Sequence, residues 1–548
     1  MTLSDFDHLR KQVAELIIVR ASGYAFDSQR KYPDRELTNN QLQDLLKLGV
    51  GGVIIFGGTI TELKLRCESF KKWANKEILL CADIEEGIGQ RFSGGTCLVP
   101  PMAIAQIYSK NKQIGVEFAE EYGRIVGDQA SRSGLNWVLA PVCDVNTNPD
   151  NPVINLRAWG EDPRTVSVLA SAFQRGISLS NVLTCAKHFP GHGDANVDSH
   201  LDLPVLDHDL QRLESLELLP FRSVLEEGAN SVMTAHLLLR SIDSICPATL
   251  SKKILTDLLR KRMDFDGLIV TDALIMESIS KTFGAEEATV MAFEAGADLI
   301  MMPEDPYKAI NAIAKSIYQK RISVQKLYKS LDRRRKELSK LISPIQLELN
   351  NNQSIYEYDN KEVSDFADTL IKKSIVYNGQ KISNIPSDAI NLLVVDRIVP
   401  DIELNTSLPA YLIPQGAGFK SIICNSSGIS PWQKDNNSKP FDLERFDGDS
   451  FFLQLFIRGN PFVGSHNNQD LWLNAINKLQ EINKLLGIVV YGCPYFWSHA
   501  IEKLDSSIPA CYSPGQMQGA QEEVLKTLIN PLLSECSYIG ERSLPFTD

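Results

Sequence analysis

Histidine and aspartate side chains gather in one short stretch of the chain, AKHFPGHGDANVDSH, residues 186–200. The 548 residues include only eight histidines, and four of them lie in or just beyond this stretch: His188, His192, His200 and His208. Imidazole and carboxylate groups can bind a metal ion or transfer protons, and they can also be no more than polar groups of a loop. We therefore use the spacing of these side chains to decide among a metal site, an acid–base pair and a polar loop.

A metal site is the first alternative. His188 and His192 are four residues apart and could share one face of a helix, with Asp194 and His200 as further ligands. The proline and the glycines of FPGHG disfavour a helix through this stretch, however. The spacing also matches no closed zinc pattern, and the cysteine partners usual in such a pattern are missing. We therefore expect neither a metal ion nor a cofactor.

An acid–base pair is better supported. Asp198 and His200 are separated by one residue, so in extended backbone their side chains point to the same side. A carboxylate bonded to one imidazole nitrogen fixes the tautomer and leaves the other nitrogen free to deliver or accept a proton. The pair predicts acid–base chemistry on a loop. A loop histidine with its hydrogen bonds satisfied locally remains the alternative from this spacing alone.

Eight apolar runs in the first part of the chain would position this loop. They are separated by amphipathic segments and are rich in Val, Ile and Leu, which is typical of parallel strands buried on both faces. The runs are LIIVRA (16–21), GGVIIFG (51–57), ILLCADI (78–84), WVLAPVCDV (137–145), LTCAKHF (183–189), SVMTAHLLL (231–239), GLIVTDALI (267–275) and DLIMMP (298–303). Eight strands alternating with helices predict a (β/α)8 barrel of the TIM type, with an open doubly wound sheet as the alternative.

Polar side chains return near the carboxyl ends of these runs. Barrel enzymes build their sites at that face, so this placement favours the barrel over the open sheet. The polar residues concerned are Asp83, Asp144, Lys187, His188, His236 and Asp272.

The composition of the chain changes after the barrel pattern. We assign residues 1–342 to the barrel, the Asn-rich stretch 343–365 to a linker and residues 366–548 to a smaller α/β sandwich-like domain. Strand-like runs such as FFLQLFIRG and GIVVYG in the last region are separated by helix-like segments.

Charge and cysteine content exclude several classes of protein. A net charge of −12 argues against general nucleic-acid binding, which needs basic patches. No window approaches the ~20 apolar residues of a membrane span, and the first residues lack the apolar core of a secretion signal. Ten cysteines without CxxC spacing predict reduced thiols and a cytoplasmic location. The oligomeric state is not fixed by these patterns.

Several motifs resemble those of one family. KHFPGHGD followed by DSH is very close to the signature of family 3 glycoside hydrolases, in their β-N-acetylglucosaminidase branch. Further similar motifs follow in the right order over about residues 10–345, whereas the C-terminal region is similar only weakly. These motifs are DIEEGIGQRF (83–92), APVCDVN (140–146), NLRAWGEDP (155–163), DFDGLIVTDAL (264–274) and AGADLIMMPED (295–305).

The resemblance implies a retaining, two-step mechanism. Asp272 corresponds to the nucleophile that forms a glycosyl-enzyme, and His200 corresponds to the acid–base group, with Asp198 as its orienting carboxylate. Four further positions match residues that hold sugar hydroxyls: Asp83, Arg157, Lys187 and His188. His192 and Asp194 match the signature, and they could either brace the loop or contact substrate.

The chain departs from the family pattern beside the first acidic motif. Glu86 stands where the family has a glycine and Ile88 where it has an arginine, which puts substrate preference in doubt more than the class of activity. The implied function is an exo-β-N-acetylglucosaminidase that removes terminal GlcNAc from glycan or peptidoglycan fragments. A phosphorylase that uses phosphate as acceptor, and a non-catalytic sugar-binding barrel, are the alternatives. In the leading case the only expected partner is a small carbohydrate.

Overall fold

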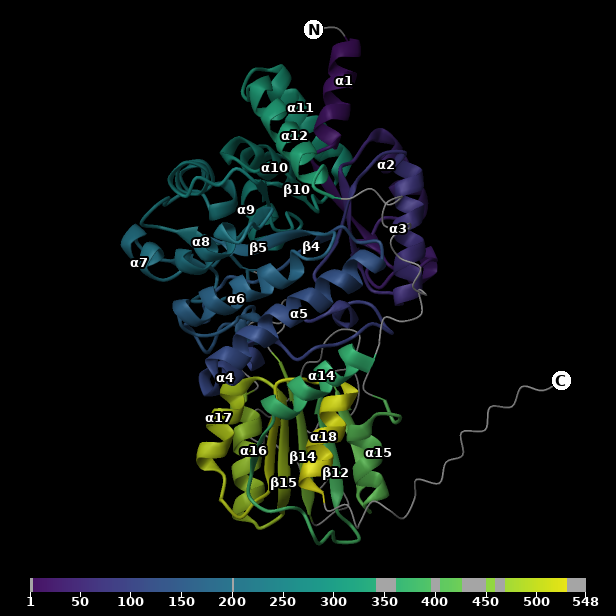
Figure 1. Ribbon diagram of the computed structural model, residues 1–548, viewed down its shortest axis with the longest axis vertical. Coiled ribbons are helices and arrows are strands. Elements are labelled where there is room, and N and C mark those ends of the chain that lie inside the picture. The colour runs from purple at the N-terminus through teal and green to yellow at the C-terminus, as the bar shows by residue number, and fades with distance from the viewer. Residues whose placement is uncertain are drawn as a thin grey trace, which may run out of the picture. The chain divides into compact units, whose positions relative to one another are not determined.

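The computed structural model of the chain describes residues 3–199, 202–341, 361–395, 405–425, 450–458 and 469–529. These residues form two compact units that divide between Ala367 and Asp368 (Figure 1). Each unit has its own sheet and its own core, so the two are described separately.

The first unit is a barrel of eight parallel strands. The strands follow one another in the order β10-β1-β2-β3-β4-β5-β7-β9, and a parallel bridge between Val270 and Leu299 joins the last strand to the segment before the first. The predicted (β/α)8 barrel is therefore confirmed, and each strand overlaps one of the eight apolar runs. The strands are β1 (Ile17–Ser22), β2 (Gly52–Phe56), β3 (Leu79–Ala82), β4 (Trp137–Val138), β5 (Leu183–Phe189), β7 (Ser231–Thr234), β9 (Leu268–Val270) and β10 (Ile300–Met301).

Helical segments follow the barrel strands and cover them on the outside. Several begin with local signals, such as the capping boxes that Thr38 forms with Gln41 and Thr59 with Glu62. The helices of this unit are α1 (Leu3–Ala14), α2 (Asn39–Leu48), α3 (Ile60–Ala74), α4 (Pro101–Lys110), α5 (Lys112–Arg132), α6 (Pro163–Ile177), α7 (Leu210–Ser215), α8 (Leu218–Glu226), α9 (Glu277–Phe283), α10 (Ala285–Ala295), α11 (Pro306–Tyr318) and α12 (Val324–Leu338). A π-type helical segment, Lys253–Arg262, follows β7 in the same way. Two further short strands, β6 (Val205–Leu206) after β5 and β8 (Leu238–Leu239) after β7, pair with each other in parallel and form a separate small sheet.

The second unit is a six-stranded sheet covered by helices on both faces. Its strand order is β11-β16-β15-β14-β12-β13, and β11 alone is antiparallel to its neighbour. One core lies under α16 and α17 and a second lies under α15 and α18, which confirms the predicted smaller α/β domain (Figure 1). The elements are α14 (Lys361–Ser374), β11 (Val376–Asn378), β12 (Ile390–Val395), α15 (Pro409–Gly416), β13 (Lys420–Asn425), β14 (Phe451–Ile457), α16 (Gln469–Glu481), β15 (Leu485–Gly492), α17 (Pro494–Lys503), β16 (Ala510–Ser513) and α18 (Gln518–Leu528).

The predicted linker, residues 343–365, lies outside the described residues up to residue 360, and its last residues begin α14. Among the helices that the structure describes, each is too short or too polar to cross a lipid bilayer. The barrel brings the polar residues near the carboxyl ends of β3, β4, β5, β7 and β9 to one rim, because the carboxyl ends of all its parallel strands lie there.

Candidate active site

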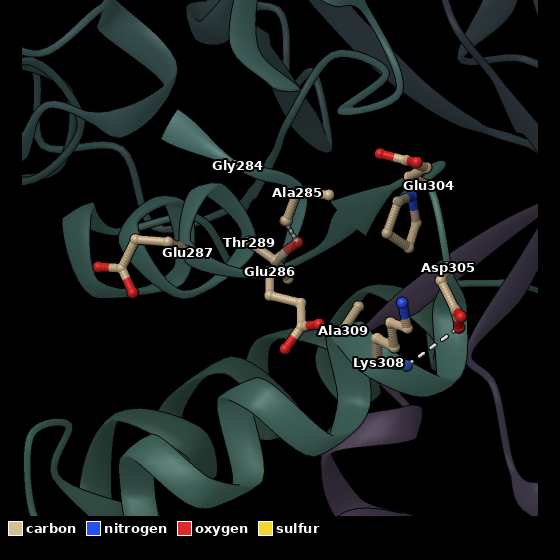
Figure 2. Close-up of a pocket in the computed structure, with 10 residues that line it drawn as sticks. Gly284, Ala285, Glu286, Glu287, Thr289, Glu304, Asp305, Lys308 and Ala309 are labelled. Carbon is tan, nitrogen blue, oxygen red and sulfur yellow. Dashed lines mark hydrogen bonds between the residues drawn. The ribbon is translucent and has the colours of Figure 1, made fainter. Parts of the chain in front are cut away.

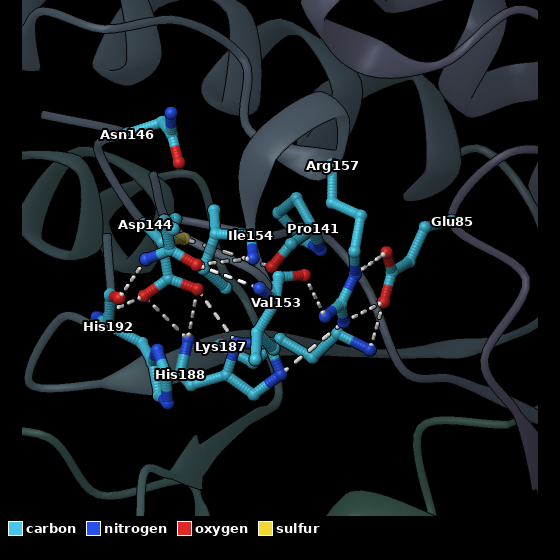
Figure 3. Close-up of polar contacts among 12 residues, drawn as sticks. Glu85, Pro141, Asp144, Asn146, Val153, Ile154, Arg157, Lys187, His188 and His192 are labelled. Carbon is cyan, nitrogen blue, oxygen red and sulfur yellow. Dashed lines mark hydrogen bonds and ion pairs between the residues drawn. The ribbon is translucent and has the colours of Figure 1, made fainter. Parts of the chain in front are cut away.

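Four charged side chains, those of Asp83, Glu85, Arg157 and Lys187, meet at the carboxyl ends of β3, β4 and β5. Figure 3 shows Glu85 between Arg157 and Lys187. The Lys187 ammonium at the end of β5 lies 2.8 Å from Oδ1 of Asp83 and 2.5 Å from Oε1 of Glu85. Arg157, in the 3-10 turn η3 (Asn155–Arg157), donates from Nε and Nη2 to the two oxygens of Glu85 at 2.8 and 2.7 Å. Two cations and two carboxylates therefore balance their charges within one connected group.

Glu85 is the centre of this group, and burial separates the inner members from the outer ones. The side chains of Glu85 and Lys187 are 3% and 1% exposed, whereas those of Asp83 and Arg157 are 21% and 16% exposed. Burial opposes the ionisation of Glu85, but the charges of Arg157 and Lys187 outweigh it and hold the pKa of this carboxyl well below its ordinary value. Glu85 is thus a permanent anion that fixes both cations.

Asp144, which follows β4, organises the neighbouring histidines. Its buried carboxylate accepts from the backbone N–H of His192 at 2.7 Å and lies 2.7 Å from Nδ1 of His188. Burial disfavours the charge on Asp144, yet its contacts with the two histidines lower the pKa of the carboxyl. Because a carboxylate can only accept, Nδ1 of His188 carries a proton. Nε2 of His188 then faces Nη2 of Arg157 at 3.5 Å, which links the histidine to the charged group.

Asparagine side chains fold the loop that carries Arg157. The Oδ1 atom of Asn151 accepts from the backbone of Val153 and Ile154 at 2.9 and 2.8 Å, and its Nδ2 donates to the carbonyl of His192 at 2.8 Å. The carbonyl of Val153 in turn accepts from Nη1 of Arg157 at 3.1 Å. The loop after β4 and the histidine loop after β5 are therefore tied together.

His192 is buried, and its ring makes no hydrogen bond to any residue that the structure describes. It is 2% exposed, and neither ring nitrogen contacts a donor or acceptor in the part of the chain that the structure describes. Burial lowers the pKa of His192 to about 4, against which the charges of Asp144 and, more weakly, Asp272 act to raise it. The imidazole is therefore neutral near pH 7.

A second ionic group holds the outer part of the histidine loop. Asp194 accepts from Nε2 of His208 at 2.9 Å and lies 3.6 Å from Nη2 of Arg212, and the buried Glu217 contacts Nε of Arg212 at 3.0 Å. Gly193 is required where the loop passes the β4 loop, because a Cβ there would lie 1.7 Å from the carbonyl oxygen of residue 145. Bracing is thus the role that the contacts of Asp194 support.

Asp272 lies at the carboxyl end of β9 and is partly buried. Its Oδ1 accepts from the backbone N–H of Ala273 at 2.7 Å, and its own N–H lies 3.4 Å from the hydroxyl of Thr234 on β7. The predicted nucleophile therefore has one carboxylate oxygen oriented by the backbone that follows it.

The structure brings together four of the predicted site residues: Asp83, Arg157, Lys187 and His188. Asp198 is buried at the end of the loop, and His200 lies outside the described residues. Sequence reasoning did not single out Glu85, although it falls two residues after Asp83 in the matched motif. It placed Asp144 at a strand end without recognising that this carboxylate orients the histidines.

A separate pocket of about 290 Å³ lies between the N-terminal ends of α10 and α11 (Figure 2). Glu286, Glu287, Glu304 and Asp305 contribute carboxylates to its wall and Lys308 a single ammonium. Asp305 is occupied as the cap of α11, since its Oδ1 accepts from the backbone N–H of Lys308 at 3.0 Å. None of the predicted site residues within the described ranges lines this pocket, so the charged group around Glu85 is the better candidate for the active site.

Both units of the chain match models of known protein families. Residues 8–335 match the glycosyl hydrolase family 3 N terminal domain, and residues 382–530 match the bacterial glycosyl hydrolase family 3 C-terminal domain. A beta-hexosaminidase of Neisseria meningitidis serogroup C is 35% identical over 275 residues, which are 49% of this chain and 76% of that relative. Beta-hexosaminidase A of Pseudoalteromonas piscicida is 33% identical over 286 residues, which are 48% of this chain. The match spans only 47% of that relative's length.

The fold is also shared by solved structures. A glycoside hydrolase family 3 beta-N-acetylglucosaminidase from Paenibacillus sp. str. FPU-7 matches with a TM-score of 0.74. The match covers 98% of this chain and 97% of that chain at 24% sequence identity, so both units of this chain have counterparts there.

Proposed function

This chain belongs to glycosyl hydrolase family 3, and on that premise we propose that it is a retaining exo-β-N-acetylglucosaminidase. The proposed reaction removes a terminal, non-reducing β-GlcNAc residue from a glycan or peptidoglycan fragment. The hexosaminidase names of the relatives that match the barrel support hydrolysis of such a sugar.

The observation that carries the proposal is the charged group at the barrel mouth. Asp83 and Arg157 are its more exposed members, so their carboxylate and guanidinium are the charged groups that a sugar can reach most easily. Lys187 uses two of its three N–H donors on Asp83 and Glu85, which leaves one for a sugar hydroxyl. Nε2 of His188 is the ring atom not used by Asp144. Hydroxyl groups on one edge of a pyranose need such a set of fixed donors and acceptors.

In the first proposed step the carboxylate of Asp272 attacks the anomeric carbon. The bond from that carbon to the aglycone oxygen breaks, and the aglycone leaves with a proton from His200, which Asp198 orients. The charges of the group around Glu85 balance, so the positive charge that develops on the sugar ring is stabilised chiefly by the carboxylate of Asp272.

In the second step water attacks the anomeric carbon of the glycosyl-enzyme. His200 takes the proton of the water, the ester bond to Asp272 breaks, and GlcNAc leaves with its β configuration retained. No step requires a bound cofactor. A cytoplasmic location and a part in peptidoglycan recycling belong to the same proposal, and the cysteine content without CxxC pairs supports a reducing compartment.

Hydrolysis of chromogenic glycosides tests the proposal. We expect the protein to cleave a 4-nitrophenyl β-GlcNAc glycoside much faster than the corresponding β-glucoside, and NMR of the first product to show the β anomer. Added phosphate should leave the product as free GlcNAc rather than the sugar 1-phosphate. A preference for the glucoside, or the α anomer as first product, would contradict the proposal.

A further inference from the structure

A chain of hydrogen bonds lies behind the proposed nucleophile and reaches it from two sides. His236, at the end of β7, has its Nε2 atom 3.1 Å from the carbonyl oxygen of Ala273 and its Nδ1 atom 2.7 Å from the hydroxyl of Thr249. The Thr249 hydroxyl lies 2.8 Å from that of Thr234, which in turn lies 3.4 Å from the backbone N–H of Asp272. His236, Thr249 and Thr234 are all fully buried.

The donors in this chain can be assigned by counting protons. A carbonyl oxygen can only accept, so Nε2 of His236 donates to Ala273. The Thr249 hydroxyl has one hydrogen, which it donates either to Nδ1 of a neutral His236 ring or to the carbonyl of Ala235 at 3.0 Å. In both arrangements its oxygen can accept from Thr234, whose own oxygen receives the N–H of Asp272.

Both ends of this hydrogen-bond network reach the proposed nucleophile, Asp272. Ala273 is fixed at its carbonyl by His236, and its N–H donates to Oδ1 of Asp272 at 2.7 Å. The orientation of that N–H therefore depends on how His236 holds the same residue. On the other side, the Thr234 hydroxyl restrains the N–H of Asp272 itself.

From this geometry we propose that His236 and Thr249 are positioning residues for Asp272. They set the backbone on both sides of the nucleophile, and through Ala273 they aim one oxygen of its carboxylate. Both are fully buried, so they act through Asp272 without contacting the sugar. The inference rests on the proposed function, because it takes Asp272 as the group that attacks the anomeric carbon.

The network and the charged group lie on different strands of the barrel, so loss of the network should affect the nucleophile without affecting sugar binding. The charged group around Glu85 is built on β3, β4 and β5, whereas the network lies at the ends of β7 and β9. Loss of the network should therefore misplace the nucleophile while the sugar-binding group stays intact. A small misplacement of a reacting group is expressed in the rate of the chemical step.

Two substitutions of Thr249 test the proposal. Thr249→Val keeps the shape and removes the hydroxyl, and Thr249→Ser keeps the hydroxyl. We expect Thr249→Val to lower kcat on the chromogenic β-GlcNAc glycoside by about tenfold or more, with KM and inhibition by free GlcNAc within about twofold of wild type. We expect Thr249→Ser to retain most of the wild-type kcat.

Active-site counting distinguishes positioning from a general structural role. The amount of glycosyl-enzyme trapped with a slow, fluorinated substrate reports the fraction of folded sites, and kcat is expressed per trapped site. A positioning role lowers the rate per site, whereas a structural role lowers only the number of sites. If Thr249→Val does not fold, Thr234→Val removes the neighbouring hydroxyl and should give the same loss of kcat.

The outcomes also separate this inference from the proposed function. Wild-type kcat per site in Thr249→Val, or an equal loss in Thr249→Ser and Thr249→Val, would overturn the positioning role. An inactive wild-type protein, or an active Asp272→Ala variant, would instead overturn the function on which the inference rests.

Discussion

Replacing Glu85 by glutamine should show how much this carboxylate, at the centre of the charged group, contributes to the stability and the activity of the protein. The change keeps the shape of the side chain and removes one negative charge between Arg157 and Lys187, both of which contact it within 2.8 Å. The group then holds two cations and only one carboxylate, Asp83. One oxygen of the carboxylate also becomes an amide N–H₂, which cannot accept from either cation.

The size of the effect follows from burial. Glu85 is 3% exposed and its cations are 16% and 1% exposed. Removing one partner of a buried ion pair costs about 3–5 kcal/mol, because the remaining charge is left buried without compensation. The glutamine still accepts one hydrogen bond, so we expect a loss near the lower end, about 3 kcal/mol of the free energy of unfolding. We also expect kcat/KM to fall by about tenfold or more, since Arg157 and Lys187 lose the group that fixes them.

A matched substitution on the surface gives the control. Glu121→Gln removes the partner of Arg124 in an exposed ion pair at 2.5 Å, with side chains 30% and 36% exposed. Exposed pairs contribute about 0–1 kcal/mol, so this variant should unfold almost like the wild type. Urea unfolding followed by tryptophan fluorescence, together with kinetics on the chromogenic glycoside, measures both variants. Equal unfolding free energies for Glu85→Gln and Glu121→Gln would refute the assignment of Glu85 as a buried anion.

Further expectations concern the histidine loop. The pKa of His192 falls from 6.5 to about 4 on folding, so between these values the unfolded chain binds a proton that the folded chain does not, and stability falls as the pH decreases. Between pH 7 and pH 4.5 the unfolding free energy of His192→Gln should therefore fall by about 2 kcal/mol less than that of the wild type. An equal fall in the two proteins would contradict a buried neutral ring. Asp194→Asn weakens the contacts to His208 and Arg212 and should lower kcat with a stability change of about 1 kcal/mol or less, because Asp194 is 32% exposed. Asp207→Asn, at a side chain 77% exposed, is the control, and equal kcat values for the two variants would argue against a bracing role.

The barrel could be predicted because its strands carry a strong local signal. Parallel strands are buried on both faces, so the run GGVIIFG is apolar throughout, and all seven residues of LTCAKHF are buried. The run at 137–145 shows the limit of that signal. Only Trp137–Val138 forms a regular strand, although the residues after it remain buried and still bond to β5, with a single parallel bridge between Val142 and Lys187. An apolar run therefore predicts a buried segment beside the sheet better than it predicts where the regular strand ends.

The charged group was only partly predictable. Asp83, Arg157, Lys187 and His188 were recognised by resemblance, but Glu85 acquires its role from contacts with residues far along the chain. Those contacts depend on the closure of the barrel, which brings the ends of β3, β4 and β5 together. The pairing of Asp198 with His200 stays a prediction, since His200 lies outside the described residues.

The central claim is that Asp272 forms a covalent bond to the sugar. An N-acetylglucosaminyl fluoride with a second fluorine at C5 slows both steps of a retaining mechanism and lets the glycosyl-enzyme accumulate, because the fluorine disfavours positive charge on the ring. Mass spectrometry of the digested protein should find one added glycosyl unit on the peptide that contains Asp272, and none in Asp272→Ala. A label on another residue, or turnover without any labelled peptide, would contradict the account.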